Sequence, residues 1–444
     1  MNTRPPFFLN GGKRTPVSQT PHAINTITRK IWICVNDKSP DTHRRLKILK
    51  NIELFITKLF IDLFYTIMRI MANLFDYLKW RGDLTFKQSP FNPVDNIIFC
   101  QLSYLPLDEI APGPDTKTSI SIGEAAEIFD AKQKANELRG FVMYKDDTNF
   151  LQTLGQTERF KNCGLFNYVN HVDIAQEKQF AAICVKFETS TYIAYRGTDV
   201  SLVGWKEDFN MSFSDAVPAQ LEAVSYLKNA AKKICGHFLI GGHSKGGNLA
   251  VYAAASCAKN IRKRITAIYS NDAPGFHQHL IDSKGFAEAR DRVYSYVPQS
   301  SIVGMLFEHG VENLVIKSSQ AGIMQHELYS WEVSHNDLIR LDGLTQQSIF
   351  IDKTLREWIN SLNYEHREQL VETLYTILTA SEAQSLPEIG DDWFKASGRM
   401  IHSLKNIDSE TKANVRKTIT ALFQAAKNNI SELLPERKKK SPAD

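Results

Sequence analysis

One serine with glycines close on both sides is the residue best placed to act as a nucleophile. It is Ser244, in the segment GHSKG at 242–246, which fits the G-x-S-x-G pattern. An apolar run at 238–240 precedes the segment and an alanine-rich run at 249–258 follows it, which favours a buried strand and then a helix. A nucleophile elbow needs this order, because the strained serine backbone leaves no room for a Cβ on its neighbours. The segment therefore predicts an elbow, and a glycine-rich structural turn is the alternative.

A nucleophilic serine needs a base within hydrogen-bond reach and a group that fixes the tautomer of that base. His326 is the candidate base, although the chain holds 12 His and a packing or surface role is the alternative. Asp272 is the candidate acid because it follows a strand expected at 265–270, on the side where parallel sheets place ligands. A turn-capping role for Asp272 is equally compatible with the sequence. Glu308 is a second candidate acid, and orientation of the base by Ser300 or by a backbone carbonyl is a third alternative.

Two further polar residues flank Ser244, and two more lie upstream of it in the sequence. His243 is expected to point away along its strand and to be structural. Lys245 is expected to be a solvated residue at the start of the helix, and an ammonium that attracts anionic acyl substrates is the alternative. Arg196 and Asp208 are expected to pair with each other and to brace the loop between them.

Strands and helices that alternate along the middle of the chain must position these residues. Two short apolar runs predict a hairpin, and a helix follows at 218–234 with Asp215 as its cap and Pro218 in its first turn. The expected strands of this region are 180–187, 191–195, 238–240, 265–270, 292–297 and 313–317. Alternation of this kind predicts an α/β fold with a mostly parallel central sheet.

Helical patterns flank this region on both sides. Residues 71–170 are expected to be mainly helical, with segments at 95–105, 122–136 and 157–169. From residue 346 onward the chain again shows helical spacing, in about three amphipathic segments. These additions are candidates for a cap that sets acyl specificity.

Three motifs taken together resemble the landmarks of the fungal-type (class 3) lipases. They are YRGTD…GWKED at 195–208, GGHSKGG at 241–247 and NDAPGF at 271–276. The chain from 71 to about 335 is also similar to the Mbeg-like family of uncharacterised bacterial proteins. This resemblance implies an α/β-hydrolase fold, serine-hydrolase machinery and a lipase- or esterase-like activity. It does not supply a substrate.

The resemblance assigns roles to individual residues. It implies that Ser244 is the nucleophile, that His326 is the general base, and that Thr198 and the Lys245 N–H form the oxyanion hole. The acid does not transfer, because residues 298–303 contain no carboxylate where class 3 lipases carry an Asp. We therefore expect a serine hydrolase that acts through an acyl-enzyme on an ester or thioester, with a small acyl or lipid substrate. A non-catalytic binding or scaffold protein is the alternative, which the missing acid favours.

The charge of +4 is unevenly distributed along the chain. Residues 1–70 carry 12 Lys and Arg against 4 Asp and Glu, and the remaining residues carry 41 against 45. The mildly acidic remainder argues against nucleic-acid binding. Residues 52–70 are apolar with scattered charges, so attachment to a membrane surface is one interpretation. The interpretation that we favour is that translation begins at Met71.

The sequence predicts four parts: a disordered basic extension at 1–70, an α/β-hydrolase domain at 71–340, a helical cap or appendage at 341–435 and a disordered tail at 436–444. Residues 1–28 lack the apolar core of a signal peptide, so we expect a cytoplasmic protein. The six Cys form no C-x-x-C pair, and neither a metal nor an organic cofactor is expected. The oligomeric state is not indicated.

Overall fold

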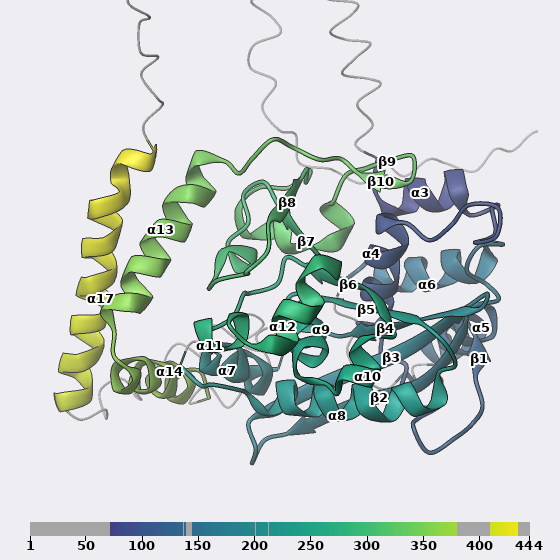
Figure 1. Ribbon diagram of the computed structural model, residues 1–444, viewed down its shortest axis with the longest axis horizontal. Coiled ribbons are helices and arrows are strands. Elements are labelled where there is room, and N and C mark those ends of the chain that lie inside the picture. Colours follow the sequence, from purple (N-terminus) through teal and green to yellow (C-terminus); the bar gives the residue numbers. More distant parts are fainter. Residues whose placement is uncertain are drawn as a thin grey trace, which may run out of the picture. The chain divides into compact units, whose positions relative to one another are not determined.

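A central eight-stranded sheet organises the protein (Figure 1). The structure, a computed structural model, describes residues 72–135, 137–138, 144–199, 201–211, 213–379 and 409–433. The strands lie in the sheet in the order of the sequence: β1 (Ile120–Ser121), β2 (Gly164–Asp173), β3 (Lys178–Phe187), β4 (Ser190–Tyr195), β5 (Phe238–His243), β6 (Ile265–Asn271), β7 (Val293–Pro298) and β8 (Asn313–Ile316). The pairs from β1 to β4 are antiparallel and those from β4 to β8 are parallel. The predicted α/β class and the hairpin β3–β4 are confirmed.

Helices cover both faces of the sheet, so the core has two layers (Figure 1). One face packs on α3 (Leu74–Arg81), α4 (Pro93–Leu102), α5 (Ile122–Lys134) and α6 (Asp147–Gln156). The other face packs on α8 (Pro218–Lys233), α9 (Lys245–Ser256) and α12 (Lys284–Ala289). The shorter elements are α7 (Leu202–Asn210), α10 (Lys259–Arg262), α11 (Gln278–Ile281) and the ribbon β9 (Val333–Ser334) with β10 (Asp337–Leu338).

Capping residues explain where several helices begin. Asn73, Asn92 and Ser121 precede α3, α4 and α5, and each forms a capping box with the acidic residue three positions later. The predicted cap of α8 is wrong. Val217 is the N-cap there, and its N–H donates to the side chain of Gln220 in place of any contact with Asp215. Pro218 is the first residue of α8, as predicted.

Two local predictions differ from the structure. The segment 157–169, expected to be helical, ends in strand β2, because residues 164–173 pair antiparallel with β3. Tyr168 therefore enters the core from a strand, and Phe160 enters it from the turn before that strand. Helix α7 was not anticipated, because charged and aromatic residues obscure its periodicity.

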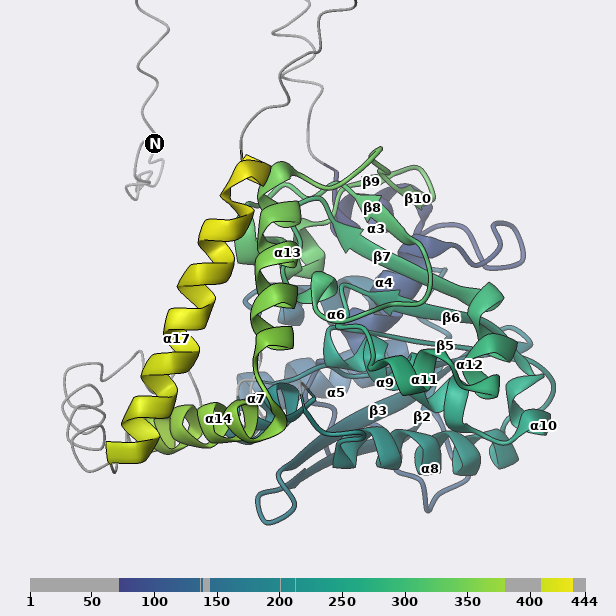
Figure 2. The ribbon, with the colours of Figure 1, turned by 60° about the vertical axis from the view of Figure 1, so that its left-hand side comes forward.

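In the described residues after the sheet the chain is helical, as the pattern from residue 346 predicts, and forms α13 (Gln346–Ser361), α14 (Tyr364–Thr379) and α17 (Ser409–Asn429). Helix α17 lies alongside α13, and α14 crosses their lower ends (Figure 2). The Trp358 indole N–H donates to the Thr418 carbonyl over 2.9 Å, which joins α13 to α17. Helix α14 also contacts α7.

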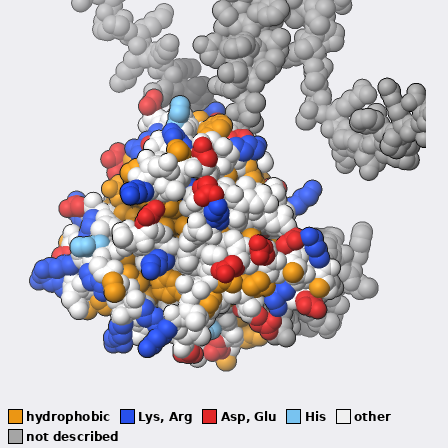
Figure 3. All heavy atoms as spheres, turned by 90° about the vertical axis from the view of Figure 1, so that its right-hand side faces the viewer, with side chains coloured by type: hydrophobic (Ala, Val, Ile, Leu, Met, Phe, Trp, Pro, Cys, Tyr) orange, Lys and Arg blue, Asp and Glu red, His pale blue; other side chains and the backbone are white. Residues whose placement is uncertain are grey.

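Acidic and basic side chains are both spread over the face drawn in Figure 3. Within the residues that the structure describes, no helix is both long and apolar enough to cross a membrane. The predictions for the basic extension, for the start at Met71 and for the tail at 436–444 lie outside the described residues.

Candidate active site

Ser244 sits at a sharp turn between β5 and α9. Its backbone has φ 56° and ψ −135°, a conformation that is strained for any residue but glycine. A Cβ on Gly242 would lie 2.2 Å from the carbonyl carbon of Gly246. A Cβ on Gly246 would lie 2.1 Å from the backbone carbonyl oxygen of Tyr195. The predicted strand–turn–helix is therefore confirmed, and the turn requires both glycines. Helix α9 starts directly after Ser244, earlier than the alanine-rich run indicates.

Two backbone segments lie close to the serine. Lys245 is the first residue of α9, so its N–H has no acceptor within the helix and lies at the positive end of the helix dipole. On the other side runs the loop that follows β4. A Cβ on Gly197 would come within 3.0 Å of the Ser244 Cβ, and the next residue is Thr198. The Thr198 hydroxyl donates to Asp208 Oδ2 over 2.5 Å, which anchors this loop to α7.

The structure brings the candidate base and the candidate acid together. His326 Nδ1 lies 2.6 Å from Oδ2 of Asp272, whose side chain is 1% exposed. The other oxygen, Oδ1, accepts hydrogen bonds from the Ser301 hydroxyl at 2.5 Å and from the Gly304 N–H at 3.1 Å. The carboxylate of Asp272 thus contacts His326, and it does not cap the turn that follows Asp272 in the chain. Nε2 is the nitrogen of His326 left for proton transfer.

The alternative partners of His326 lie elsewhere. Glu308 is exposed and forms an ion pair with Arg356 of α13. The Ser300 hydroxyl is 2.9 Å from that of Thr345. The stretch that lacks the expected acid instead supplies Ser301, which supports a carboxylate that follows β6.

His243 lies between His326 and the first helical layer. Its Nε2 is 2.7 Å from the carbonyl oxygen of His326, and its Nδ1 is 2.8 Å from the Tyr104 hydroxyl. A carbonyl only accepts, so Nε2 carries the hydrogen and Nδ1 accepts from Tyr104. Burial, and next the neighbouring His326, lower the pKa of His243 well below its ordinary value, so the ring stays neutral. His243 thus has a structural role, as predicted, because its ring holds the carbonyl of His326. The prediction that it points away is wrong, because the ring faces His326.

His326 lies beside the residue that precedes Ser244. The rings of His243 and His326 are 4.3 Å apart between centroids, and Ser244 directly follows His243. Among the described residues the hydroxyl of the half-buried Ser244 forms no hydrogen bond, with His326 or with any other group. Hydrogen bonds between a nucleophile and its base are commonly long without substrate and shorten when substrate binds.

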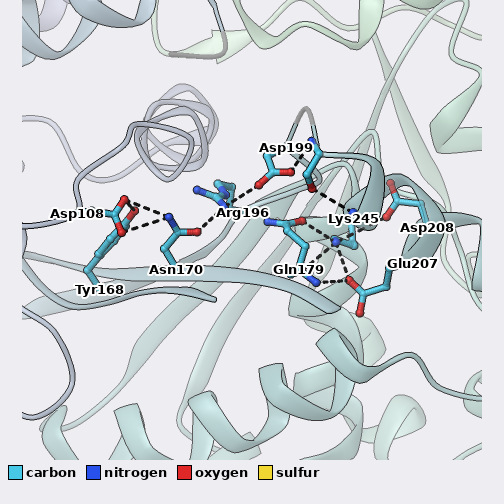
Figure 4. Close-up of polar contacts among 11 residues, drawn as sticks. Asp108, Tyr168, Asn170, Gln179, Arg196, Asp199, Glu207, Asp208 and Lys245 are labelled. Carbon is cyan, nitrogen blue, oxygen red and sulfur yellow. Dashed lines mark hydrogen bonds and ion pairs between the residues drawn. The ribbon is translucent and has the colours of Figure 1, made fainter. Parts of the chain in front are cut away.

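The expectation that Lys245 is solvated is wrong. Its side chain is 1% exposed, and its Nζ lies 2.9 Å from Glu207 Oε2 and 2.8 Å from Gln179 Oε1 (Figure 4). The alternative of an ammonium that attracts anionic substrates fails for the same reason, since the charge is compensated in the interior. The sequence reasoning missed Glu207 and Gln179. Glu207 had one available signal, its position next to Asp208.

Arg196 and Asp208 do not pair with each other. The Arg196 guanidinium contacts Asp199 at 3.3 Å and Asn170 at 2.8 Å (Figure 4). The carboxylate of Asp208 instead accepts a hydrogen bond from the Thr198 hydroxyl. Burial raises the pKa of Asp208 to about 6, although Lys245 lowers it in part. Tyr104, also missed, gave no signal in the sequence.

No group of three or more potential metal ligands is present in the described part of the chain. The profile of the Mbeg1-like family matches residues 154–376, half of the chain. The chain belongs to the Mbeg1-like family. The predicted family is therefore confirmed, but the bounds differ: the match begins at 154 and not at 71, and it ends beyond 335, where it includes most of α14. With its parallel strands, its helices on both faces and its elbow after β5, this family member has the α/β-hydrolase fold, as predicted.

Two solved structures to which the chain is similar are fungal lipases. A Rhizomucor miehei lipase–propeptide complex is 15% identical with a TM-score of 0.29, over 44% of this chain and 66% of that one. The Lip2 lipase of Yarrowia lipolytica is 13% identical with a TM-score of 0.28, over 47% of this chain and 80% of that one. The match thus spans just under two thirds of the Rhizomucor protein. No curated protein sequence matches the chain significantly.

Proposed function

We propose that this protein is a serine hydrolase that cleaves a carboxylic ester or thioester through an acyl-enzyme. The observation that carries the proposal is the convergence of Ser244, His326 and Asp272. Ser244 and Asp272 directly follow the paired parallel strands β5 and β6, and His326 is hydrogen-bonded to Asp272. A nucleophile, a base and a group that orients the base are the parts that acyl transfer requires.

The proposed reaction begins with proton transfer from the Ser244 hydroxyl to His326 Nε2 as the oxygen attacks the substrate carbonyl. Asp272 stabilises the imidazolium that forms and holds Nδ1–H toward itself. The backbone N–H groups of Thr198 and Lys245 stabilise the oxyanion, a contribution of about 3 kcal/mol per donor. His326 then returns the proton to the leaving alcohol or thiol. A water molecule, deprotonated by His326, releases the acid and restores Ser244.

Supporting groups keep this geometry in place. His243 holds the carbonyl of His326, so the base is fixed both through its side chain and through its backbone. A Cβ on Gly304 would lie 2.3 Å from Asp272 Oδ1, so glycine is required where its N–H donates to that oxygen. Such preorganisation lowers the cost of reaching the transition state.

The test is labelling with a fluorophosphonate, followed by intact mass measurement. Wild type should gain one adduct, Ser244→Ala should gain none, and His326→Ala should react far more slowly. Circular dichroism of each variant serves as the control for folding. Absence of an adduct on folded wild type would overturn the proposal and favour the binding or scaffold alternative. If the adduct forms, acyl esters of increasing chain length will define the substrate.

A further inference from the structure

A buried charge cluster lies directly beneath the proposed oxyanion site. Lys245 of α9 reaches across to β3, where its ammonium donates to the Gln179 carbonyl at 3.0 Å and to the Gln179 side chain (Figure 4). It reaches α7 as well, where Glu207 lies at 2.9 Å and Asp208 at 3.9 Å. One side chain thus connects the start of α9 with two other elements.

Glu207 is itself held firmly. Its side chain is fully buried, and its oxygens accept the backbone N–H groups of Gln179 at 3.0 Å and Ala219 at 2.8 Å. The ammonium of Lys245 therefore docks on a carboxylate whose position is already fixed by the backbone. The position of the Lys245 ammonium is therefore fixed relative to β3 and α8, and the cluster serves as a rigid reference point for the groups bonded to it.

Both proposed oxyanion donors are attached to this reference point. One donor is the N–H of Lys245 itself. The other belongs to Thr198, whose hydroxyl donates to Asp208, the residue after Glu207. The Thr198 methyl group also packs against α7, since a Cβ on Gly204 would lie 2.8 Å from it. A shift of the cluster would therefore change the distance between the two donors.

We propose that Lys245 is a positioning residue for the oxyanion site, and that its buried ammonium sets the spacing of the two N–H donors. This inference rests on the proposed function. Helix stability does not explain a Lys at this position, because a cation in the first turn opposes the helix dipole. Core stability does not explain it either, because apolar side chains of similar volume commonly serve as well as a buried ion pair.

The cluster also leaves polar atoms without a hydrogen bond. Gln179 Nε2 and Asp208 Oδ1 are buried and form none, although Asp208 Oδ1 lies 3.9 Å from the Lys245 ammonium. Buried polar atoms without a hydrogen bond lower the stability of the fold. Their presence beside the strained Ser244 is typical of a site in which geometry is maintained at the expense of stability.

The first variant to test is Lys245→Met, which keeps the length of the side chain and removes its charge. Lys245→Met/Glu207→Gln is the second variant, because it removes both charges of the closest ion pair if the single variant fails to fold. We expect the rate constant of fluorophosphonate labelling to fall about 10- to 100-fold in both, since a misplacement of about 1 Å costs on the order of 100-fold. With a p-nitrophenyl ester, kcat should fall and KM should change little.

A second readout separates oxyanion positioning from a general structural effect. An oxyanion hole stabilises negative oxygen better than negative sulfur, so wild type should prefer an oxo ester over its thiono analogue. The variants should lose part of this preference. The matched control is Arg159→Met/Asp95→Asn, which removes another fully buried ion pair, far from Ser244 in the sequence and in contact with other elements.

The outcomes are distinguishable at a temperature where all proteins are folded. Slower labelling and a reduced oxo preference in the Lys245 variants, with wild-type values in the control, would support the inference. Wild-type labelling by folded Lys245→Met/Glu207→Gln would overturn it and leave the proposed function intact. An equal loss in the control would also overturn it, because the effect would then follow stability alone. If wild type is not labelled, the proposed function and the inference both fail.

Discussion

Two buried ion pairs in this protein differ in how completely their polar atoms are satisfied. Arg159 and Asp95, both 0% exposed, join through two contacts of 2.6 and 2.8 Å. Asp95 also accepts from the Tyr77 hydroxyl, and Arg159 donates to the Ser89 carbonyl. The pair Lys245–Glu207 is equally buried, but its neighbours Gln179 and Asp208 each keep a buried atom without a hydrogen bond.

The difference separates a structural region from a candidate functional one. The Arg159 pair joins α4 to the loop after α6, and every contact holds segments together. The Lys245 pair lies next to Ser244 and Asp272, which both have positive φ. Strained backbone and unsatisfied polar atoms thus accompany the Lys245 pair, while the Arg159 pair has each of its own polar atoms hydrogen-bonded. Substitutions in the two regions should therefore affect different properties of the protein.

The largest effect should follow from Asp272→Asn. The amide cannot hold His326 in the tautomer that presents Nε2 as a base, so kcat should fall by about 10⁴-fold. Labelling kinetics measure the loss, and the unfolding midpoint in urea shows whether the fold is retained. Labelling within tenfold of wild type would mean that Asp272 is not the acid.

Arg159→Met should act on stability and leave the chemistry unchanged. It leaves Asp95 as an uncompensated buried charge, which costs about 3–5 kcal/mol of unfolding free energy. Urea denaturation measures this cost. Below the unfolding transition the variant should label at the wild-type rate, and a slowed rate would show that the two regions are coupled.

The buried histidines predict a dependence of stability on pH. Burial lowers the pKa of His243 and His309 below the ordinary value of 6.5. Below pH 6.5 the unfolded chain binds protons that the folded chain does not, so the unfolding free energy falls as pH falls. Each ring that stays neutral contributes a slope of about 1.4 kcal/mol per pH unit.

Denaturant titrations between pH 7.5 and about 5.5 measure this slope. His309→Gln should reduce it, because that ring is 8% exposed and its Nε2 has no hydrogen-bond partner. Stability that does not change over this range would contradict the prediction.

The smallest effect is expected for Glu308→Gln. Glu308 pairs with Arg356 at the surface, and such pairs contribute about 0–1 kcal/mol. Neither stability nor labelling should change measurably. A loss of labelling comparable to that of Asp272→Asn would instead identify Glu308 as the acid.

The sequence predicted the sheet and the elbow because both have local signals. Apolar runs marked β3 to β8, and the glycines around Ser244 marked the turn that the structure contains. The contact between Asp272 and His326 was proposed only as one of several alternatives. It depends on how β6 and the segment after β8 meet in space, which no local pattern encodes.

The errors around the site have one physical origin. The sequence predicts Lys245 in solvent because a Lys at the start of a helix is usually exposed. Only the tertiary structure brings Glu207 next to its ammonium. The predicted pairing of Arg196 with Asp208 fails for the same reason. Spacing along the chain does not show that the Thr198 hydroxyl donates a hydrogen bond to Asp208. Spacing along the chain does not predict which distant residue a charged side chain will contact.

Lys206 links the proposed catalytic part of the chain to its C-terminal helices. Its side chain is 5% exposed and lies 2.7 Å from Glu177 and 2.8 Å from Glu372 of α14. Burial alone would lower its pKa, but the bonds to Glu177 and Glu372 outweigh burial and raise it. A chain shortened to residue 340 would keep Ser244, yet it would leave this ammonium short of one of its two carboxylates. The helix that carries Glu207 and Asp208 would lose support, so the apparent boundary near 340 is a poor place to divide this protein into modules.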